Sequence, residues 1–93
     1  MTSFRFAVQI ARIVREDGSQ GPEHFDLVHI IKGDPGGTPF DVAKDGALRT
    51  LRRCEGWLEG HPEELRRTRQ LIAKVEGLDE DAASRLPDGR NEL

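Results

Sequence analysis

The chain has 93 residues, 33% charged and 35% hydrophobic, and its 17 acidic side chains outnumber its 14 basic ones to give a net charge of −3. A chain of this length forms one domain with a thin core, and an acidic balance argues against attachment to nucleic acid or anionic lipid by overall charge. No apolar run approaches the roughly 20 residues that cross a bilayer. Arg5, Gln9 and Arg12 interrupt the N-terminal apolar stretch, and the single Cys54 cannot form an intramolecular disulfide, so we expect a cytoplasmic protein without a signal peptide.

A strand is expected first. Apolar side chains alternate with other residues from Phe4 to Ile10, which is the period of a strand with one buried face. The alternation slips at Ile13, and a bulge near Ala11 would explain the slip. Residues 15–23 contain EDGSQGP, a composition typical of a loop.

Residues 24–32 are compatible with a strand or with a short helix. Pro22 and Gly33 would mark the beginning and the end of a helix. The many β-branched side chains, with Val28 and Ile30 on one face, favour a strand instead. We therefore predict that this segment pairs antiparallel with the first strand.

The stretch GDPGGTPFD, residues 33–41, resembles a phosphate-binding loop at the start of a helix. Gly36, Gly37 and an N-cap at Thr38 could direct backbone N–H groups at an anion. The glycine spacing fits neither common nucleotide-binding motif, no lysine follows, and two prolines remove N–H donors. We interpret the stretch as a connecting turn and expect no cofactor.

An amphipathic helix follows this turn, because apolar residues recur there every three or four positions. Thr38 would be its N-cap and Pro39 its first residue. Gly46 leaves a second interpretation open, in which residues 39–44 form a third short strand and the helix begins at Asp45. We favour the longer helix.

Residues 47–59 are helical in both interpretations, and Gly60 ends the helix. A second helix begins at Pro62 and stops at Gly77, and the short connection predicts an antiparallel helical hairpin. Asp79 then caps a short third helix that stops at Pro87.

These elements predict a small α+β fold. Residues 1–86 would form a single domain in which an N-terminal antiparallel β-hairpin, with a third strand in the second interpretation, packs on the helical hairpin and the short C-terminal helix. Residues 87–93 would form a flexible tail. A two-stranded ribbon is marginal alone, so it must pack on the helices and leave a sheet edge open. That edge would allow a homodimer or pairing with another protein's sheet.

The helical hairpin is net basic within an acidic chain, since residues 44–74 contain eight basic and five acidic side chains. An ordinary solvated helix face has the same composition. Such a surface could also meet phosphates or an acidic protein, with an exposed tryptophan as an anchor. The candidate macromolecule-binding residues are Arg49, Arg52, Arg53, Trp57, Arg66 and Arg67.

Nucleophilic or metal chemistry would have to use Cys54 or one of three histidines. Cys54 falls on the apolar stripe of its helix, where packing is its usual role. His24 and His29 fall on opposite strand faces, and His61 precedes a helix, so neither a catalytic set nor a metal site is expected. The acidic pairs at the helix starts, such as Glu63 and Glu64, are explained by the helix dipole and should be solvated, with Glu63 pairing with Arg67.

The sequence therefore favours a non-enzymatic cytoplasmic protein of bacterial or phage type that binds a protein partner as an adaptor, regulator or inhibitor. The alternative is a nucleic-acid-binding module that uses the arginine faces of the helical hairpin. No membrane association is expected, and a homodimer would form through the sheet edge.

Overall fold

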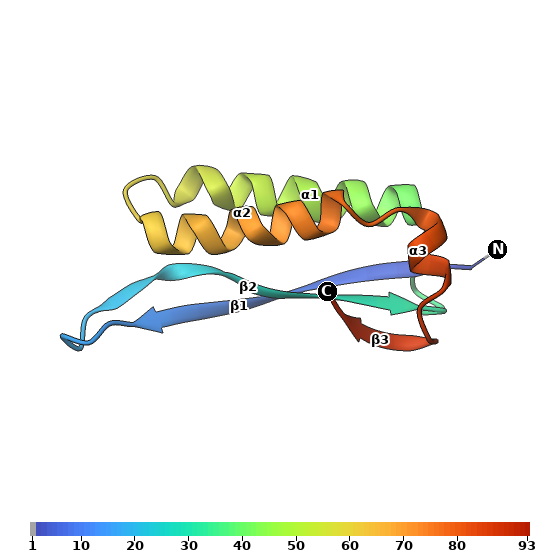
Figure 1. Cartoon of the computed structure of the whole chain (residues 1–93), viewed down its shortest axis with the longest axis horizontal. Helices are drawn as coiled ribbons and strands as arrows, with labels where there is room; N and C mark the ends of the chain where they lie inside the picture. Colours follow the sequence, from blue (N-terminus) through green and yellow to red (C-terminus); the bar gives the residue numbers. More distant parts are fainter. Residues whose placement is uncertain (1) are drawn as a thin grey trace.

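The structure is a computed structural model that describes residues 2–93, with only the backbone described at Ile13. The elements are, in chain order, β1 (Phe4–Val14), β2 (Gln20–Lys32), α1 (Phe40–Trp57), α2 (Pro62–Glu76), α3 (Glu80–Ser84) and β3 (Gly89–Glu92). The strands form an antiparallel sheet in the order β1-β2-β3. Figure 1 shows α1 and α2 side by side along one sheet face, with none of the described helices on the other. The predicted α+β fold is confirmed.

The two long strands form an elongated hairpin, in a molecule of about 49 × 20 × 20 Å. The predicted strand at residues 24–32 is confirmed, but it begins earlier, at Gln20, so the loop expected over residues 15–23 is shorter. Two register shifts interrupt the pairing, and in both the extra residue belongs to β2. At the first shift, Gln9 pairs with Leu27 and Ile10 with Phe25, so Asp26 of β2 has no partner residue on β1. The bulge expected near Ala11 is therefore a bulge of the partner strand. The face that Ile13 occupies lies outside the described residues.

The third strand comes from the C-terminus. Residues 87–93 were expected to be a flexible tail, but β3 pairs with residues 29–32 of β2, and the Leu93 N–H donates to the Val28 carbonyl. Gly89 makes the reversal before β3 with φ of 97°, a conformation that favours glycine. The strand interpretation of residues 39–44 is wrong, because α1 begins at Phe40.

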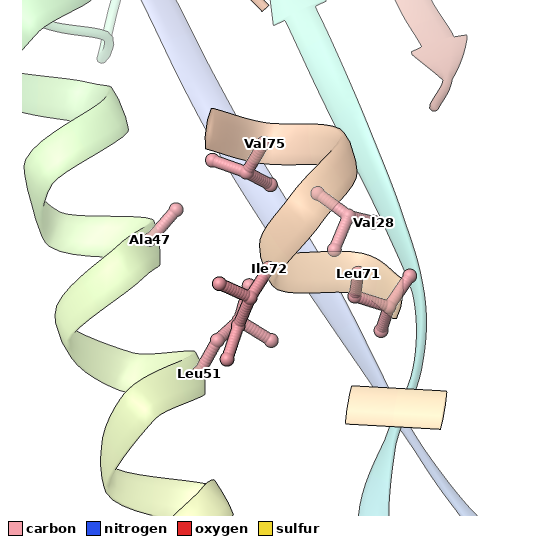
Figure 2. Close-up of a cluster of buried hydrophobic side chains, with 6 residues drawn as sticks. All are labelled: Val28, Ala47, Leu51, Leu71, Ile72 and Val75. Atoms are coloured by element: carbon pink, nitrogen blue, oxygen red, sulfur yellow. The ribbon is translucent and has the colours of Figure 1, made fainter. Parts of the chain in front are cut away.

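The core lies between the sheet and the helical hairpin. Six buried side chains from β2, α1 and α2 meet there (Figure 2): Val28, Ala47, Leu51, Leu71, Ile72 and Val75. A second cluster lies towards the N-terminal end of β1, where Phe4 and Phe40 stack edge to face with ring centroids 5.5 Å apart. The predicted apolar stripes of both long helices are thus their buried faces. Because α1 contacts mainly β1 and α2 mainly β2, α1 lies along the outer side of the hairpin.

The helix starts follow the sequence with one exception, whereas α1 and α3 end earlier than expected, at Trp57 and Ser84. Pro62 is in the first turn of α2, and the Asp79 carboxylate caps α3 by accepting from the Ala82 N–H. Pro39, not Thr38, occupies the N-cap position of α1, and no side chain caps this helix. Thr38 is used elsewhere, because its backbone bonds to Phe4.

Candidate functional site: the edge of β1

The outer edge of β1 carries a row of backbone groups without a strand beside it in the described part of the chain. The Phe4 N–H donates to the Thr38 carbonyl at 2.8 Å, and Thr38 donates back at 2.9 Å, so Phe4 points its backbone groups outward. At the other end, the Arg15 N–H points inward and donates to Ser19 at 2.8 Å. Backbone direction alternates along a strand. The outward residues are therefore Phe6, Val8, Ile10, Arg12 and Val14.

This edge has little of the usual protection against pairing, because Arg12 is the one charged residue among its outward positions. Edge strands are commonly short, charged, bulged or interrupted by proline. β1 has 11 residues without proline, and the irregularities of the hairpin lie in β2. The opposite edge differs, because β3 has four residues, including Arg90 and Glu92, and the unpaired part of β2 contains Pro22 and the Asp26 bulge.

A groove runs between this edge and α1. Its volume is about 460 Å³, with Phe6 and Val8 of β1 on one side and Val42, Gly46 and Thr50 of α1 on the other. These three α1 residues recur every fourth position, so they form one stripe of the helix. A Cβ at Gly46 would meet no atom within 4 Å, so packing inside the chain does not require a glycine at this position. A glycine in the middle of a helix also makes the helix less stable than an alanine would. Gly46 and Thr50 keep the groove open.

Among the side chains that the structure describes, the largest exposed apolar ones lie along the same side of the molecule. Trp57 is 67% exposed, Val14 66%, Ile10 60% and Val42 58%. Ile10 and Trp57 line a common hollow of about 50 Å³ at the hairpin end, whereas Val42 lines the groove at the other end. Large exposed apolar side chains that follow an open strand edge are typical of a protein interface.

Cys54 and His24 lie at the base of that small hollow. Cys54 is buried on α1, as predicted. His24 is also buried, with its Nδ1 3.2 Å from the Pro22 carbonyl and its Nε2 without a partner among the described residues. The sequence did not indicate that these two residues line one cavity. No hydrogen bond joins them within residues 2–93, and the hollow has a volume of about 50 Å³.

Several of the arginines proposed as a binding surface are paired with carboxylates. Arg49 pairs with Asp45, which raises the pKa of the guanidinium through a hydrogen bond and charge attraction. Arg52 pairs with Glu76 across the helical hairpin, and Arg67 with Asp26 on β2 at 2.8 Å.

Three of the six candidates thus already have a carboxylate partner. Arg67 was expected to pair with Glu63, and that expectation is wrong because Arg67 points towards the sheet. Arg53 and Arg66 are exposed on different helices, without an ion pair in the described part of the chain. Trp57 alone of the six lines the hollow beside the edge of β1.

A buried ion pair supports the hairpin end of the molecule. Glu64 was expected to be solvated, yet its side chain is 0% exposed, and its Oε1 accepts from Arg15 Nη2 at 2.8 Å. A Cβ on Gly21 would overlap this carboxylate, so β2 needs a glycine at the closest approach. The pair ties the end of β1 to the first turn of α2.

The stretch GDPGGTPFD is a tight turn that uses its own donors. The Gly36 N–H donates to the Asp34 carboxylate at 2.8 Å, the Gly37 N–H to the Asp34 carbonyl at 2.9 Å, and the Thr38 N–H to Phe4. The hydrogen bond from Gly36, followed by one from Arg5, lowers the pKa of Asp34. The three N–H groups that a phosphate cradle would need are therefore occupied within the fold.

Metal-binding clusters and membrane-spanning helices are both absent from residues 2–93. No group of three or more His, Cys, Asp or Glu side chains is arranged to hold a metal ion there. No helix in that range is long and apolar enough to cross a membrane. Comparisons with models of known families, with curated proteins and with solved structures give no match.

Proposed function

We propose that this chain is a non-enzymatic cytoplasmic protein that binds a protein partner by strand addition. An extended segment of the partner pairs with the outer edge of β1 and places alternate side chains in the groove below α1. The carrying observation is the coincidence of three features on one side of the molecule: the long open edge of β1, the groove at Gly46, and the exposed apolar side chains. Main-chain hydrogen bonds then supply affinity, and the groove supplies specificity.

The dimensions support an extended occupant. The free outward residues extend from Phe6 to Val14, nine residues, which is about 30 Å of strand at roughly 3.4 Å per residue. A groove of about 460 Å³ has room for a few side chains but is open along its length. The occupant is therefore a strand with apolar residues at every second position.

The arginine pairing argues against the nucleic-acid alternative. A phosphate would have to compete with the carboxylate partners of Arg49, Arg52 and Arg67. Exposed ion pairs of this kind are weak individually, but each reduces the local positive charge. The net charge of −3 opposes phosphate binding further.

Two substitutions on one helix test the proposal. Gly46→Leu fills the groove, and Gly56→Leu adds the same side chain elsewhere on α1, where a Cβ also meets no atom within 4 Å. Both should preserve or raise helix stability. Tagged wild-type protein and both variants are used to capture partners, which are identified by mass spectrometry.

We expect that at least one protein is captured by the wild type and by Gly56→Leu but is not captured by Gly46→Leu. On binding, amide exchange should slow at outward residues such as Val8, whereas inward residues, already bonded to β2, should change little. Equal capture by both variants would refute the groove as the site. Tight binding of a fluorescent oligonucleotide, weakened steeply by salt, would instead support the alternative.

A further inference from the structure

The edge of β1 is complementary to itself. We propose that a second copy of this chain occupies it, with the two β1 strands antiparallel across a twofold axis at Ile10. This inference rests on the proposed function, because it names the partner of the same edge. The two sheets, each with the order β1-β2-β3, then become one continuous sheet with both helical hairpins on the same face.

The register follows from which backbone groups are free. Antiparallel pairing must join outward residues with outward residues. With Ile10 opposite Ile10, Phe6 pairs with Val14 of the second copy and Val8 with Arg12, so every outward residue from 6 to 14 is used. Shifting the axis to Gln9 would bring Val14 opposite Phe4, whose outward groups already bond to Thr38. Shifting it to Ala11 would leave Phe6 without a partner.

The side chains in this register are compatible. Arg12, the one charged residue among the outward positions, lies opposite Val8, so no two charges within β1 face each other. Phe6 and Val8 pack on the core below α1, and Ile10 lines the hollow beside Trp57, so these side chains share the helix-covered face. The pairing thus keeps Phe6, Ile10 and Val14 together on that face, and the Arg12 side chain beside Val8 already has a carboxylate partner in Glu23, 3.1 Å away.

One symmetric contact brings together the four large apolar side chains that are exposed among the described residues. The two Ile10 side chains meet on the axis, and each Trp57 lies beside its own Ile10. Val14 of one copy lies next to Phe6 of the other, which lines the same groove as Val42. Self-association therefore accounts for exposure that the single chain leaves unexplained.

The primary measurement is the mass in solution by light scattering at high micromolar concentration. We expect twice the chain mass of 10.4 kDa, or about 21 kDa. Ile10→Lys removes the apolar contact of the two Ile10 side chains and places two like charges opposite each other on the axis, so it should raise the dissociation constant at least tenfold. Gln70→Lys, the same charge change on the exposed surface of α2, is the matched control and should leave the mass doubled.

Cross-linking tests the register and remains informative if Ile10→Lys fails to fold. In a Cys54→Ala background, Ile10→Cys places two thiols on residues with Cα atoms about 5.5 Å apart, within disulfide range. Arg12→Cys places them four residues apart along the strands, or about 13 Å, which is too far. Oxidation should yield a covalent dimer for Ile10→Cys alone.

A monomeric mass, or a dimer that Ile10→Cys fails to cross-link, would overturn this inference. If the protein is a monomer in solution but Gly46→Leu still loses a captured protein, the second copy is refuted as the occupant, and strand addition by another protein is still supported. A dimer with the predicted cross-link but with equal capture by both glycine variants would support self-pairing without a further partner in the groove.

Discussion

The ion pair between Arg15 and Glu64 allows a sharp test of how the hairpin end is held to the helices. The Glu64 side chain is fully buried, whereas that of Arg15 is 35% exposed. Arg15→Met removes the cation and leaves a carboxylate without access to water. Breaking a buried pair in this way costs about 3 to 5 kcal/mol, and partial exposure of the arginine places the expected loss near 3 kcal/mol.

Removing the other partner should cost less. Glu64→Gln keeps the side-chain volume and removes the charge, and the guanidinium left behind can be hydrated, so we expect a loss of about 1 kcal/mol. In the Glu64→Gln background, Arg15→Met should then cost about 1 kcal/mol. The difference from its cost of about 3 kcal/mol in the wild type is a coupling free energy of about 2 kcal/mol. Urea denaturation of the four proteins at one concentration measures these values. A loss below about 0.5 kcal/mol for Arg15→Met, or no coupling, would refute the buried-charge explanation.

Gly21 provides a second perturbation of the same pair. Gly21→Ala puts a methyl group against the Glu64 carboxylate, and displacing that buried group should cost about 1 to 3 kcal/mol. In a Glu64→Ala background the carboxylate is gone, so the same substitution should be nearly neutral. If Gly21→Ala lowers the free energy of unfolding equally in the wild type and in Glu64→Ala, the effect comes from the backbone of β2 and the contact with the carboxylate is refuted as its cause.

Two further predictions concern the turn before α1. Gly37→Ala would bring a Cβ within 2.7 Å of the Phe4 carbonyl oxygen, and because the backbone cannot move away easily, we expect the free energy of unfolding to fall by about 2 kcal/mol. The control is Gly56→Ala, whose Cβ meets no neighbour and which should be neutral or stabilising. Urea denaturation measures both variants. The pKa of Asp34 is lowered from 3.8 by the Gly36 N–H, so the NMR titration of its carboxyl should have a midpoint below 3.8. The contribution of the Asp34 carboxylate to the free energy of unfolding should be complete above pH 3.8 and be lost as pH falls through the lower folded-state pKa. A titration midpoint at or above 3.8 would contradict the hydrogen bond from Gly36.

The sequence by itself determined the element types wherever the signal was periodic. The alternation around Phe6 and Val8 indicated β1, and the stripe through Leu51 and Leu71 indicated two long helices and their buried faces. These signals are strong because burial of one face imposes a fixed spacing along the chain. The plain turn at residues 33–38 also followed from local composition.

The tertiary structure alone decided the contacts between distant segments. β3 is too short and polar to be periodic, and it forms because Leu93 packs on the core and the edge of β2 is free. Glu64 is buried because Arg15, 49 positions earlier, meets it across the hairpin end. An open sheet edge followed from the sequence, because two strands cannot cover both of their edges. Which edge stays open, and the groove beside it, were decided only when β3 paired with β2 and α1 packed along β1, since local spacing carries no information about what lies beside a strand.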